Sequence, residues 1–283
     1  MKCKILDGKK FAEESYIKLK VRSANLLEKI GRKPNLQAII IGNDPASKTY
    51  VGMKERACLK NGVETKTHQL SENVTTNEVI DLVHKLNSSP EVDGILMQHP
   101  APKHINEIEC FNTISLEKDV DGVTTAGYGR LSMGINAFGS CTPLGIMRLL
   151  DYYNIELQGL NALVVGRSQI LGKPMAAMLL NANATVTIAH SKTLNLYELL
   201  KEADLIVAAV GVPRFIKSSS LKKGTILVDA GYHPTENCGD VDLDGIEEIA
   251  SAFTPVPGGV GPMTINTLIS VSYTHLTLPT ICS

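Results

Sequence analysis

The chain has 283 residues, of which 43% are hydrophobic and 20% are charged, a composition typical of a globular protein large enough for two domains. Its 28 basic residues almost balance its 29 acidic residues, so no overall charge indicates a nucleic acid or a membrane surface as a partner. The six cysteines form no Cys-x-x-Cys pairs, which predicts reduced thiols. The sequence shows no apolar run of membrane-spanning length and no signal-peptide core, so a cytoplasmic protein is predicted.

The first part of the chain alternates between helical and extended patterns. Apolar residues with helical spacing predict a helix over residues 11–30 that ends at Gly31. Strands are predicted at 36–42, 63–70 and 92–98, and helices at 48–61 and 76–86. This alternation predicts an α/β fold with a largely parallel sheet. The region between Pro102 and Lys118 is predicted to be irregular.

The second part of the chain predicts a second α/β domain. Thr142 as N-cap and Pro143 at the first helical position indicate a helix that ends near residue 153. The apolar run from Ala162 to Val165 predicts a buried strand that ends at Gly166, and a helix begins near Gly172-Lys173-Pro174. Further strands are predicted at 184–189, 204–210 and 225–229.

The strand, turn and helix around Gly166 have the form of a phosphate cradle, in which backbone N–H groups at a helix N-terminus face an anion. The spacing is Gly-x-Ser-x-x-x-Gly-x-Pro rather than Gly-x-Gly-x-x-Gly, so a glycine-rich connection without a ligand is the alternative. The next strand ends without the carboxylate that would bind a ribose 2′-hydroxyl. Arg167, Ser191 and Lys192 instead favour a 2′-phosphate, and hence NADP over NAD, although Ser191 and Lys192 could also cap the helix that begins near Asn195.

Two segments near the end of the sequence differ from the rest. Residues 254–264 hold so many glycines and prolines that we expect a fixed loop close to a ligand, and a helix is predicted to start at Thr264–Ile269. The β-branched stretch 271–283 is interpreted as a non-native tail from read-through or a cloning scar. A short genuine strand is the alternative.

Tyr50 and Lys54 are four residues apart on a predicted helix and therefore share one face. A solvated lysine beside a packed tyrosine would give the same spacing. The Tyr-x-x-x-Lys pattern also occurs in short-chain dehydrogenases, but there it lies downstream of the nucleotide loop. Here it lies more than a hundred residues upstream of that loop, which argues against a short-chain dehydrogenase.

Polar residues at the end of the third predicted strand are further candidates. Gln98 and Asp121 could both point into a crevice at the carboxyl ends of the strands, or Asp121 could simply end a turn before Gly122. His99 and His104 have no third metal ligand at a suitable spacing, so no metal site is predicted.

Taken in order, these segments resemble one family, the bifunctional methylenetetrahydrofolate dehydrogenase/cyclohydrolases. The resemblance covers residues 5 to about 269, and it is carried by Tyr50-Val51-Gly52-Met53-Lys54, Asp93-Gly94-Ile95-Leu96-Met97-Gln98, Lys118-Asp119-Val120-Asp121-Gly122, Cys141-Thr142-Pro143, Gly166-Arg167-Ser168 through Pro174, His190-Ser191 and the loop Pro257–Thr264. It implies a folate-binding catalytic domain of residues 1–138 and 262–283 and a Rossmann-like NADP-binding domain of residues 139–261. It also implies an active-site cleft between the two domains and a homodimer.

The resemblance implies roles for individual residues. Lys54 would be the catalytic lysine and Gln98 the partner that orients it, while Tyr50 would lie along the pterin ring and Asp121 would bond the pterin's amino edge. The other residues expected to contact folate are Val51, Gly52, Met53, Met97, His99, Pro257, Gly258, Gly259, Val260, Gly261 and Pro262. Those expected to contact NADP are Gly166, Arg167, Ser168, Ser191, Tyr232 and Thr264.

The sequence departs from the family in two places that flank the expected folate pocket. The family often has Gln-Leu-Pro-Leu-Pro where this chain has Gln98-His99-Pro100-Ala101-Pro102, and often an aromatic residue where this chain has Val123-Thr124-Thr125. Both departures bear on folate and inhibitor affinity more than on the type of reaction.

The reaction implied by the resemblance oxidises 5,10-methylenetetrahydrofolate with NADP and hydrolyses the methenyl product to 10-formyltetrahydrofolate. A cation that forms beside the Lys54 ammonium favours loss of its proton, so the neutral amine could activate water directly or through Gln98. Two other functions stay open. One is a shikimate-type dehydrogenase, which also pairs an upstream lysine with an aspartate, and the other is a non-catalytic NADP-binding or scaffold protein.

Overall fold

The computed structural model describes residues 3–135 and 137–277, whose contacts divide the chain into two compact units. Unit 1 comprises Met1–Glu14, Leu131–Gly134 and Thr142–Thr264, and unit 2 comprises Ser15–Arg130, Ile135–Cys141 and Ile265–Ser283. Within the described residues, no helix is long and apolar enough to cross a membrane.

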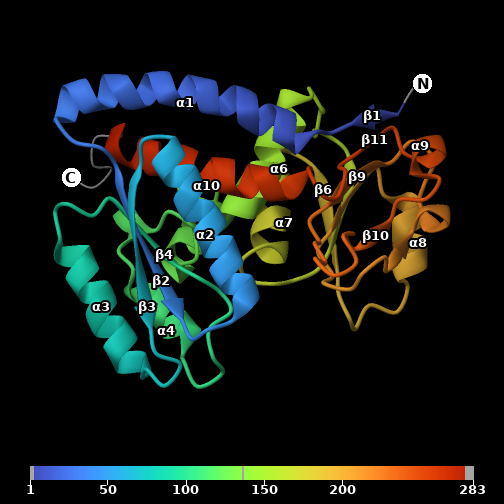
Figure 1. The fold of residues 1–283 in the computed structure, drawn as a ribbon. Helices are drawn as coiled ribbons and strands as arrows, with labels where there is room; N and C mark the ends of the chain where they lie inside the picture. Colours follow the sequence, from blue (N-terminus) through green and yellow to red (C-terminus); the bar gives the residue numbers. More distant parts are fainter. Residues whose placement is uncertain (1–2, 136, 278–283) are drawn as a thin grey trace. The chain divides into compact units, whose positions relative to one another are not determined.

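Unit 2 contains a parallel sheet of three strands in the order β3-β2-β4 (Figure 1). The strands are β2 (Asn35–Ile41), β3 (Glu64–Leu70) and β4 (Gly94–Met97). The helices that belong to this unit alone are α2 (Pro45–Lys60), α3 (Thr76–Ser88), α4 (Glu107–Thr113) and the 3-10 helix η1 (Leu116–Lys118). The helices that contribute residues to both units are α1 (Gly8–Ile30), α5 (Thr125–Ser132), α6 (Cys141–Tyr152) and α10 (Val260–Thr277).

Side chains that alternate along β2 pack against different helices on the two faces of the sheet. Ile39 joins a hydrophobic core with Val79 of α3, whereas Ala38 lines a pocket with Val51 of α2. Both faces of the strand are therefore covered, as is usual for a parallel sheet. This packing holds α2 against the sheet and so determines where Lys54 lies.

Unit 1 contains a parallel sheet of six strands in the order β1-β11-β9-β7-β5-β6. These strands are β1 (Lys4–Ile5), β5 (Asn161–Val165), β6 (Thr185–Ala189), β7 (Leu205–Ala208), β9 (Ile226–Asp229) and β11 (Ala252–Phe253). The remaining elements are α7 (Gly172–Asn181), α8 (Leu196–Glu202), α9 (Ile246–Ile249), the 3-10 helix η2 (Ser218–Ser220) and the paired strands β8 (Ile216–Lys217) and β10 (Val241–Asp242).

The strand order reverses at β5, which has β6 on one side and β7 on the other. Val165 at the end of β5 pairs with Ala189 of β6 and with Ala208 of β7. The loops that follow these three strands therefore leave from one edge of the sheet. In open parallel sheets, the carboxyl edge at such a reversal is the usual place for a ligand.

The predicted α/β class with a Rossmann-like parallel sheet is confirmed, and each predicted strand overlaps an observed one. Four predicted helix starts are wrong. The helix α1 begins at Gly8, before Phe11. The helix α2 begins at Pro45 rather than Lys48, because the Asp44 carboxylate accepts the Ser47 N–H (2.7 Å) and Pro45 occupies the first turn. The helix α6 begins at Cys141, so Thr142 lies inside its first turn and is not the N-cap. The helix α10 begins at Val260, before Thr264.

Two further expectations are wrong. The region between Pro102 and Lys118 was expected to be irregular, but it contains α4, which is capped by Asn106. The helix α5, for which no prediction was made, is capped by the Thr124 hydroxyl. Residues 271–277 are helical, so the strand alternative fails for that segment. The non-native origin of the tail stays a prediction, and residues 278–283 lie outside the described residues.

Candidate active site and nucleotide site

Lys54 is a buried lysine on the face of α2 that also carries Tyr50. Its relative exposure is 8%, so the interpretation as a solvated surface lysine is wrong. The Lys54 ammonium nitrogen lies 4.6 Å from the centroid of the Tyr50 ring, one helical turn earlier, which is the geometry of a cation–π contact. The same ammonium donates to Gln98 Oε1 at 3.4 Å.

Gln98 directly follows β4, and its side-chain amide is oriented by the backbone next to it. Gln98 Nε2 donates to the carbonyl oxygen of His99 at 2.7 Å. Because the nitrogen is engaged there, the oxygen of the same amide faces Lys54. The lysine therefore meets a neutral acceptor of fixed orientation.

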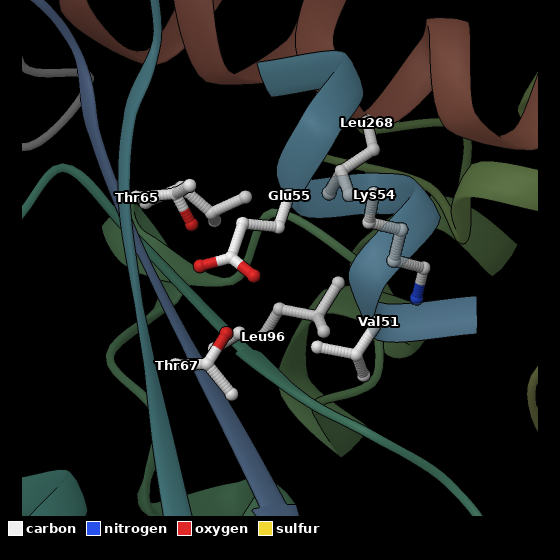
Figure 2. Close-up of a pocket in the computed structure, with 9 residues that line it drawn as sticks. Val51, Lys54, Glu55, Thr65, Thr67, Leu96 and Leu268 are labelled. Carbon is white, nitrogen blue, oxygen red and sulfur yellow. The ribbon is translucent and has the colours of Figure 1, made fainter. Parts of the chain in front are cut away.

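A pocket beneath α2 shows in which direction the lysine extends. It is lined by Leu36, Ala38, Val51, Lys54, Glu55, Thr65, Thr67, Leu96 and Leu268. Figure 2 shows the Glu55 carboxylate directed toward Thr65 and Thr67 of β3, while the Lys54 amine extends to the opposite side. Lys54 thus contributes its aliphatic stem to the pocket and carries its charge away from Glu55.

Asp121 belongs to the same neighbourhood through Cys141, a residue to which the sequence assigned no role. Cys141 is 1% exposed, and its thiol donates to the Val120 carbonyl at 3.2 Å. Burial raises the pKa of the Cys141 thiol well above its usual value, the Asp121 charge raises it further, and the Lys54 charge opposes both. Cys141 is therefore close enough to sense both ionic side chains.

The other predicted folate contacts are more scattered. Met97 is 2% exposed and packs in the core on the α3 side of the sheet, whereas Met53 is 44% exposed on α2, where Val51 and Gly52 also lie. His99 is exposed, and its Nδ1 lies 2.9 Å from Glu107 Oε1. The residues Pro257, Gly258, Gly259, Val260, Gly261, Pro262 and Thr264 belong to unit 1.

The nucleotide cradle of unit 1 is built on close backbone packing around Gly166. The Gly166 N–H donates to the Ala189 carbonyl at 2.8 Å, which ties the loop after β5 to the end of β6. A Cβ on Gly166 would collide with the Ala209 carbonyl, and a Cβ on Gly172 would collide with the Gly166 carbonyl. Only glycine fits at either position, as in turns where a helix packs close to a strand and a phosphate approaches the backbone.

Polar side chains lie around this turn. Ser168 Oγ accepts the N–H groups of Leu171 and Gly172 at 3.2 Å each, and these residues are the N-cap and the first residue of α7. Arg167 and Ser191 are exposed and lie just beyond the paired residues Val165 and Ala189. The helix α8 begins at Leu196 with Asn195 as its N-cap, so the alternative that Ser191 caps this helix is wrong.

Two buried aspartates that the sequence did not single out shape the loops after β7 and β9. Asp240 accepts the N–H groups of Val210 (2.5 Å) and Gly211 (2.9 Å), and His233 Nε2 lies 2.9 Å from its carboxylate. Asp229 accepts three N–H groups, including that of Gly231 at 2.9 Å. Burial raises the pKa of Asp229 to about 6 despite these bonds.

Two further residues predicted to contact the cofactor are Tyr232, which lies in the loop after β9, and Thr264, which lies in α10. Tyr232 is 56% exposed and follows β9. Thr264 is 8% exposed, and its hydroxyl donates to Thr142 Oγ1 at 3.0 Å. The run Asp229-Ala230-Gly231 at the end of β9 is a sequence signal that could have indicated this part of the site.

Unit 1 has a glycine-rich turn at the reversal of its strand order, and unit 2 of the same chain is an α/β unit with a buried lysine. This combination defines the class of two-domain α/β enzymes with a nucleotide-binding sheet. The family models identify the member of that class. The NAD(P)-binding domain of tetrahydrofolate dehydrogenase/cyclohydrolase matches residues 140–277, and its catalytic domain matches residues 6–121. The chain belongs to the tetrahydrofolate dehydrogenase/cyclohydrolase family.

Relatives and solved structures agree with this assignment. The bifunctional protein FolD of Psychrobacter arcticus is 55% identical over 267 residues, which cover 94% of this chain and 90% of the relative. The Campylobacter jejuni bifunctional FolD structure has a TM-score of 0.94 at 41% identity and covers 97% of this chain and 98% of that one. The Trypanosoma brucei FolD structure, a complex with NADP cofactor and inhibitor, has a TM-score of 0.92 at 31% identity and covers 98% of both chains.

A shikimate dehydrogenase from Aquifex aeolicus matches less well. Its TM-score is 0.52 at 14% identity, over 86% of this chain and 98% of that one. This likeness extends to the fold alone.

Proposed function

We propose that the protein oxidises 5,10-methylenetetrahydrofolate to 5,10-methenyltetrahydrofolate with NADP and hydrolyses the product to 10-formyltetrahydrofolate. Family membership and the bifunctional relatives support the pair of reactions. The observation that carries the proposal is the buried Lys54 ammonium, which has the Tyr50 ring at 4.6 Å and the Gln98 amide oxygen at 3.4 Å.

NADP is the proposed cofactor because the residues of unit 1 fit it. The Gly166 and Gly172 positions leave no room for a Cβ, and Arg167, Ser191 and Lys192 are exposed donors beyond the ends of β5 and β6. These donors suit a 2′-phosphate, whereas a carboxylate would suit the free hydroxyl of NAD. The NADP-containing Trypanosoma brucei relative supports the same choice. Bound NADP supplies the acceptor for the hydride.

Lys54 is the proposed catalyst of the hydrolysis. When the folate one-carbon bridge becomes a methenyl cation, the new positive charge raises the free energy of a nearby ammonium and favours its deprotonation. The neutral amine can then take a proton from the attacking water, a role that typically accelerates a reaction about a hundred- to ten-thousandfold. Gln98 positions the amine by accepting a hydrogen bond from it. Because the acceptor is an uncharged oxygen, it stabilises the ammonium form less than a carboxylate would.

The remaining assignments follow from the family resemblance. Tyr50 is proposed to lie along the pterin ring, and Asp121 to bond its amino edge. Val51, Gly52, Met53, Met97, His99 and residues 257–262 are proposed as further folate contacts, and Gly166, Arg167, Ser168, Ser191, Tyr232 and Thr264 as cofactor contacts. The catalytic domain is proposed to comprise residues 1–138 and 262–283, and the cofactor domain residues 139–261.

A cytoplasmic homodimer is the proposed physical state of the enzyme. The homodimer rests on the family resemblance and is open to test by the molar mass in solution. The five cysteines among the described residues are all free thiols, which is typical of a reducing compartment.

A spectrophotometric assay tests the proposed function. Methylenetetrahydrofolate and NADP should give the ultraviolet absorbance of the methenyl product, NAD should serve less well, and added methenyltetrahydrofolate should be hydrolysed faster than in buffer. Oxidation of shikimate would instead support the shikimate-type alternative. Intact NADP binding with no turnover of either substrate would support the non-catalytic alternative.

A further inference from the structure

The loop that carries Asp121 is closed by one buried carboxylate, that of Asp119. Asp119 is 1% exposed. Its Oδ1 accepts the Val123 N–H at 3.0 Å, and its Oδ2 accepts the Thr124 N–H at 2.9 Å. The Asp119 backbone in turn forms a parallel bridge with Ile95 of β4. The two hydrogen bonds thus close the loop that contains Asp121, and the backbone bridge anchors this loop to the sheet.

Two hydrogen bonds from a segment outside this loop hold it as well. The Ser140 hydroxyl donates to the Gly122 carbonyl at 3.1 Å, and the Cys141 thiol donates to the Val120 carbonyl at 3.2 Å. These two carbonyls flank Asp121 along the backbone. Gly122 has a φ of 61°, and a Cβ there would come within 2.5 Å of the Ser140 nitrogen, so the segments are in direct contact.

Asp119 itself is engaged too deeply to bind a ligand. Both of its oxygens accept backbone N–H groups, and almost none of its surface is exposed. Burial is the main cause that raises the pKa of Asp119 above its usual value, while the N–H groups of Thr124 and Val123 oppose this shift. A buried carboxylate costs free energy that an uncharged side chain would not, so its role must lie in the conformation that it imposes.

We propose that Asp119 is a positioning residue that sets the place of the Asp121 carboxylate for the folate substrate. The inference rests on the proposed function, in which Asp121 bonds the amino edge of the pterin. Asp119 acts through Asp121 and touches no substrate. Ser140 and Cys141 support the same loop from the other side.

A double-mutant cycle at Asp119 and Asp121 tests this inference in the full-length enzyme. Asp119→Asn keeps the size of the side chain but turns an N–H₂ group toward one of the two backbone N–H donors. The loss of one buried bond should raise the KM for methylenetetrahydrofolate about tenfold, with kcat and the Kd for NADP changed less than about twofold. In an Asp121→Asn background, Asp119→Asn should add less than about twofold, because the group through which it acts is already gone.

Asn112→Ala is the matched control. Asn112 Oδ1 accepts the Thr125 N–H at 2.8 Å, the next amide along the chain but outside the closed loop. This variant should lower the thermal midpoint and leave the KM for folate within about twofold. An equal rise in KM in Asn112→Ala would mean that any loosening near α5 has the same effect, and the inference would fail.

The outcomes separate the inference from the function on which it rests. In one outcome the wild type turns over methylenetetrahydrofolate, but Asp119→Asn raises the KM equally whether or not Asp121 is intact. That outcome overturns the inference and leaves the proposed function standing. A wild-type enzyme that does not turn over methylenetetrahydrofolate overturns both. Should Asp119→Asn fail to fold, Ser140→Ala takes its place in the cycle, with a KM rise that must vanish in the Asp121→Asn background.

Discussion

The Lys54 ammonium donates to Gln98 Oε1 across 3.4 Å, which is longer than the usual N–H···O hydrogen bond. Catalytic hydrogen bonds are often long before substrate binds. The nature of the acceptor matters more than the distance. An amide oxygen positions an amine but attracts its proton less than a carboxylate does. The proposed mechanism, in which Lys54 loses that proton when a cation forms nearby, therefore favours an amide over a carboxylate at position 98.

Gln98→Glu should therefore separate the two proposed activities. A carboxylate at this position would stabilise the ammonium form of Lys54, so we expect hydrolysis of methenyltetrahydrofolate to fall about tenfold or more at neutral pH. Its half-maximal rate should move to higher pH, while hydride transfer should change less. Rates of both reactions measured from pH 6 to 9 check this. A parallel loss of both activities with no shift of the pH profile would contradict it.

Lys54→Met removes the amine and keeps an unbranched apolar chain in the pocket beneath α2. We expect hydrolysis to fall at least about a hundredfold, because a general base is lost. Folate binding, measured by titration, should change only severalfold. Leu268, which lines the same pocket, offers a matched control, since Leu268→Met alters the packing and leaves the amine. A Lys54→Met enzyme that hydrolyses at the wild-type rate would rule Lys54 out.

The two sites differ in how much of them the sequence predicts. Gln98 could be placed at the carboxyl end of a strand, because parallel strands end at a common edge. The burial of Lys54 could not be predicted, because the helical spacing it shares with Tyr50 also suits an exposed face. That burial depends on which side of α2 meets the β2 and β4 strands, which is a property of the tertiary packing.

Residues in loops were the hardest to interpret. The carboxylate of Asp119 accepts two amides across a turn in which Gly122 adopts a positive φ, and nothing in local spacing reveals that turn. Asp229 and Asp240 are 11 residues apart and become linked only when the intervening loop folds back. The start of α2 is different, since Asp44 followed by Pro45 is a recognisable N-terminal signal, yet the helix was predicted to begin only at residue 48.

Arg167→Ala tests the cofactor preference. Loss of a charge-assisted bond to a 2′-phosphate should weaken NADP about tenfold or more, and NAD less than about twofold. Binding titrations with both nucleotides measure the difference. Arg214→Ala is the matched control, because Arg214 is also a surface arginine of unit 1 but pairs with Glu236 at 3.0 Å. Equal losses for NADP and NAD in Arg167→Ala would count against a phosphate contact.

Asp229 should make unit 1 lose stability as the pH rises. Burial raises the pKa of Asp229 to about 6 from 3.8, so the folded state binds this proton more tightly than the unfolded chain does. The contribution to the free energy of unfolding is fully present below pH 3.8 and is lost as the pH rises through about 6, with a total of about 2 to 3 kcal/mol. Urea unfolding at a series of pH values should show this slope in the wild type and lose it in Asp229→Asn.

Asp204 is the matched control and gives the opposite sign, because its hydrogen bond with Lys222 lowers the pKa of Asp204. The stability that Asp204 contributes is lost only as the pH falls below the usual range of a carboxylate. If Asp229→Asn and Asp204→Asn changed the pH slope in the same direction, the assignment of a raised pKa to Asp229 would be wrong.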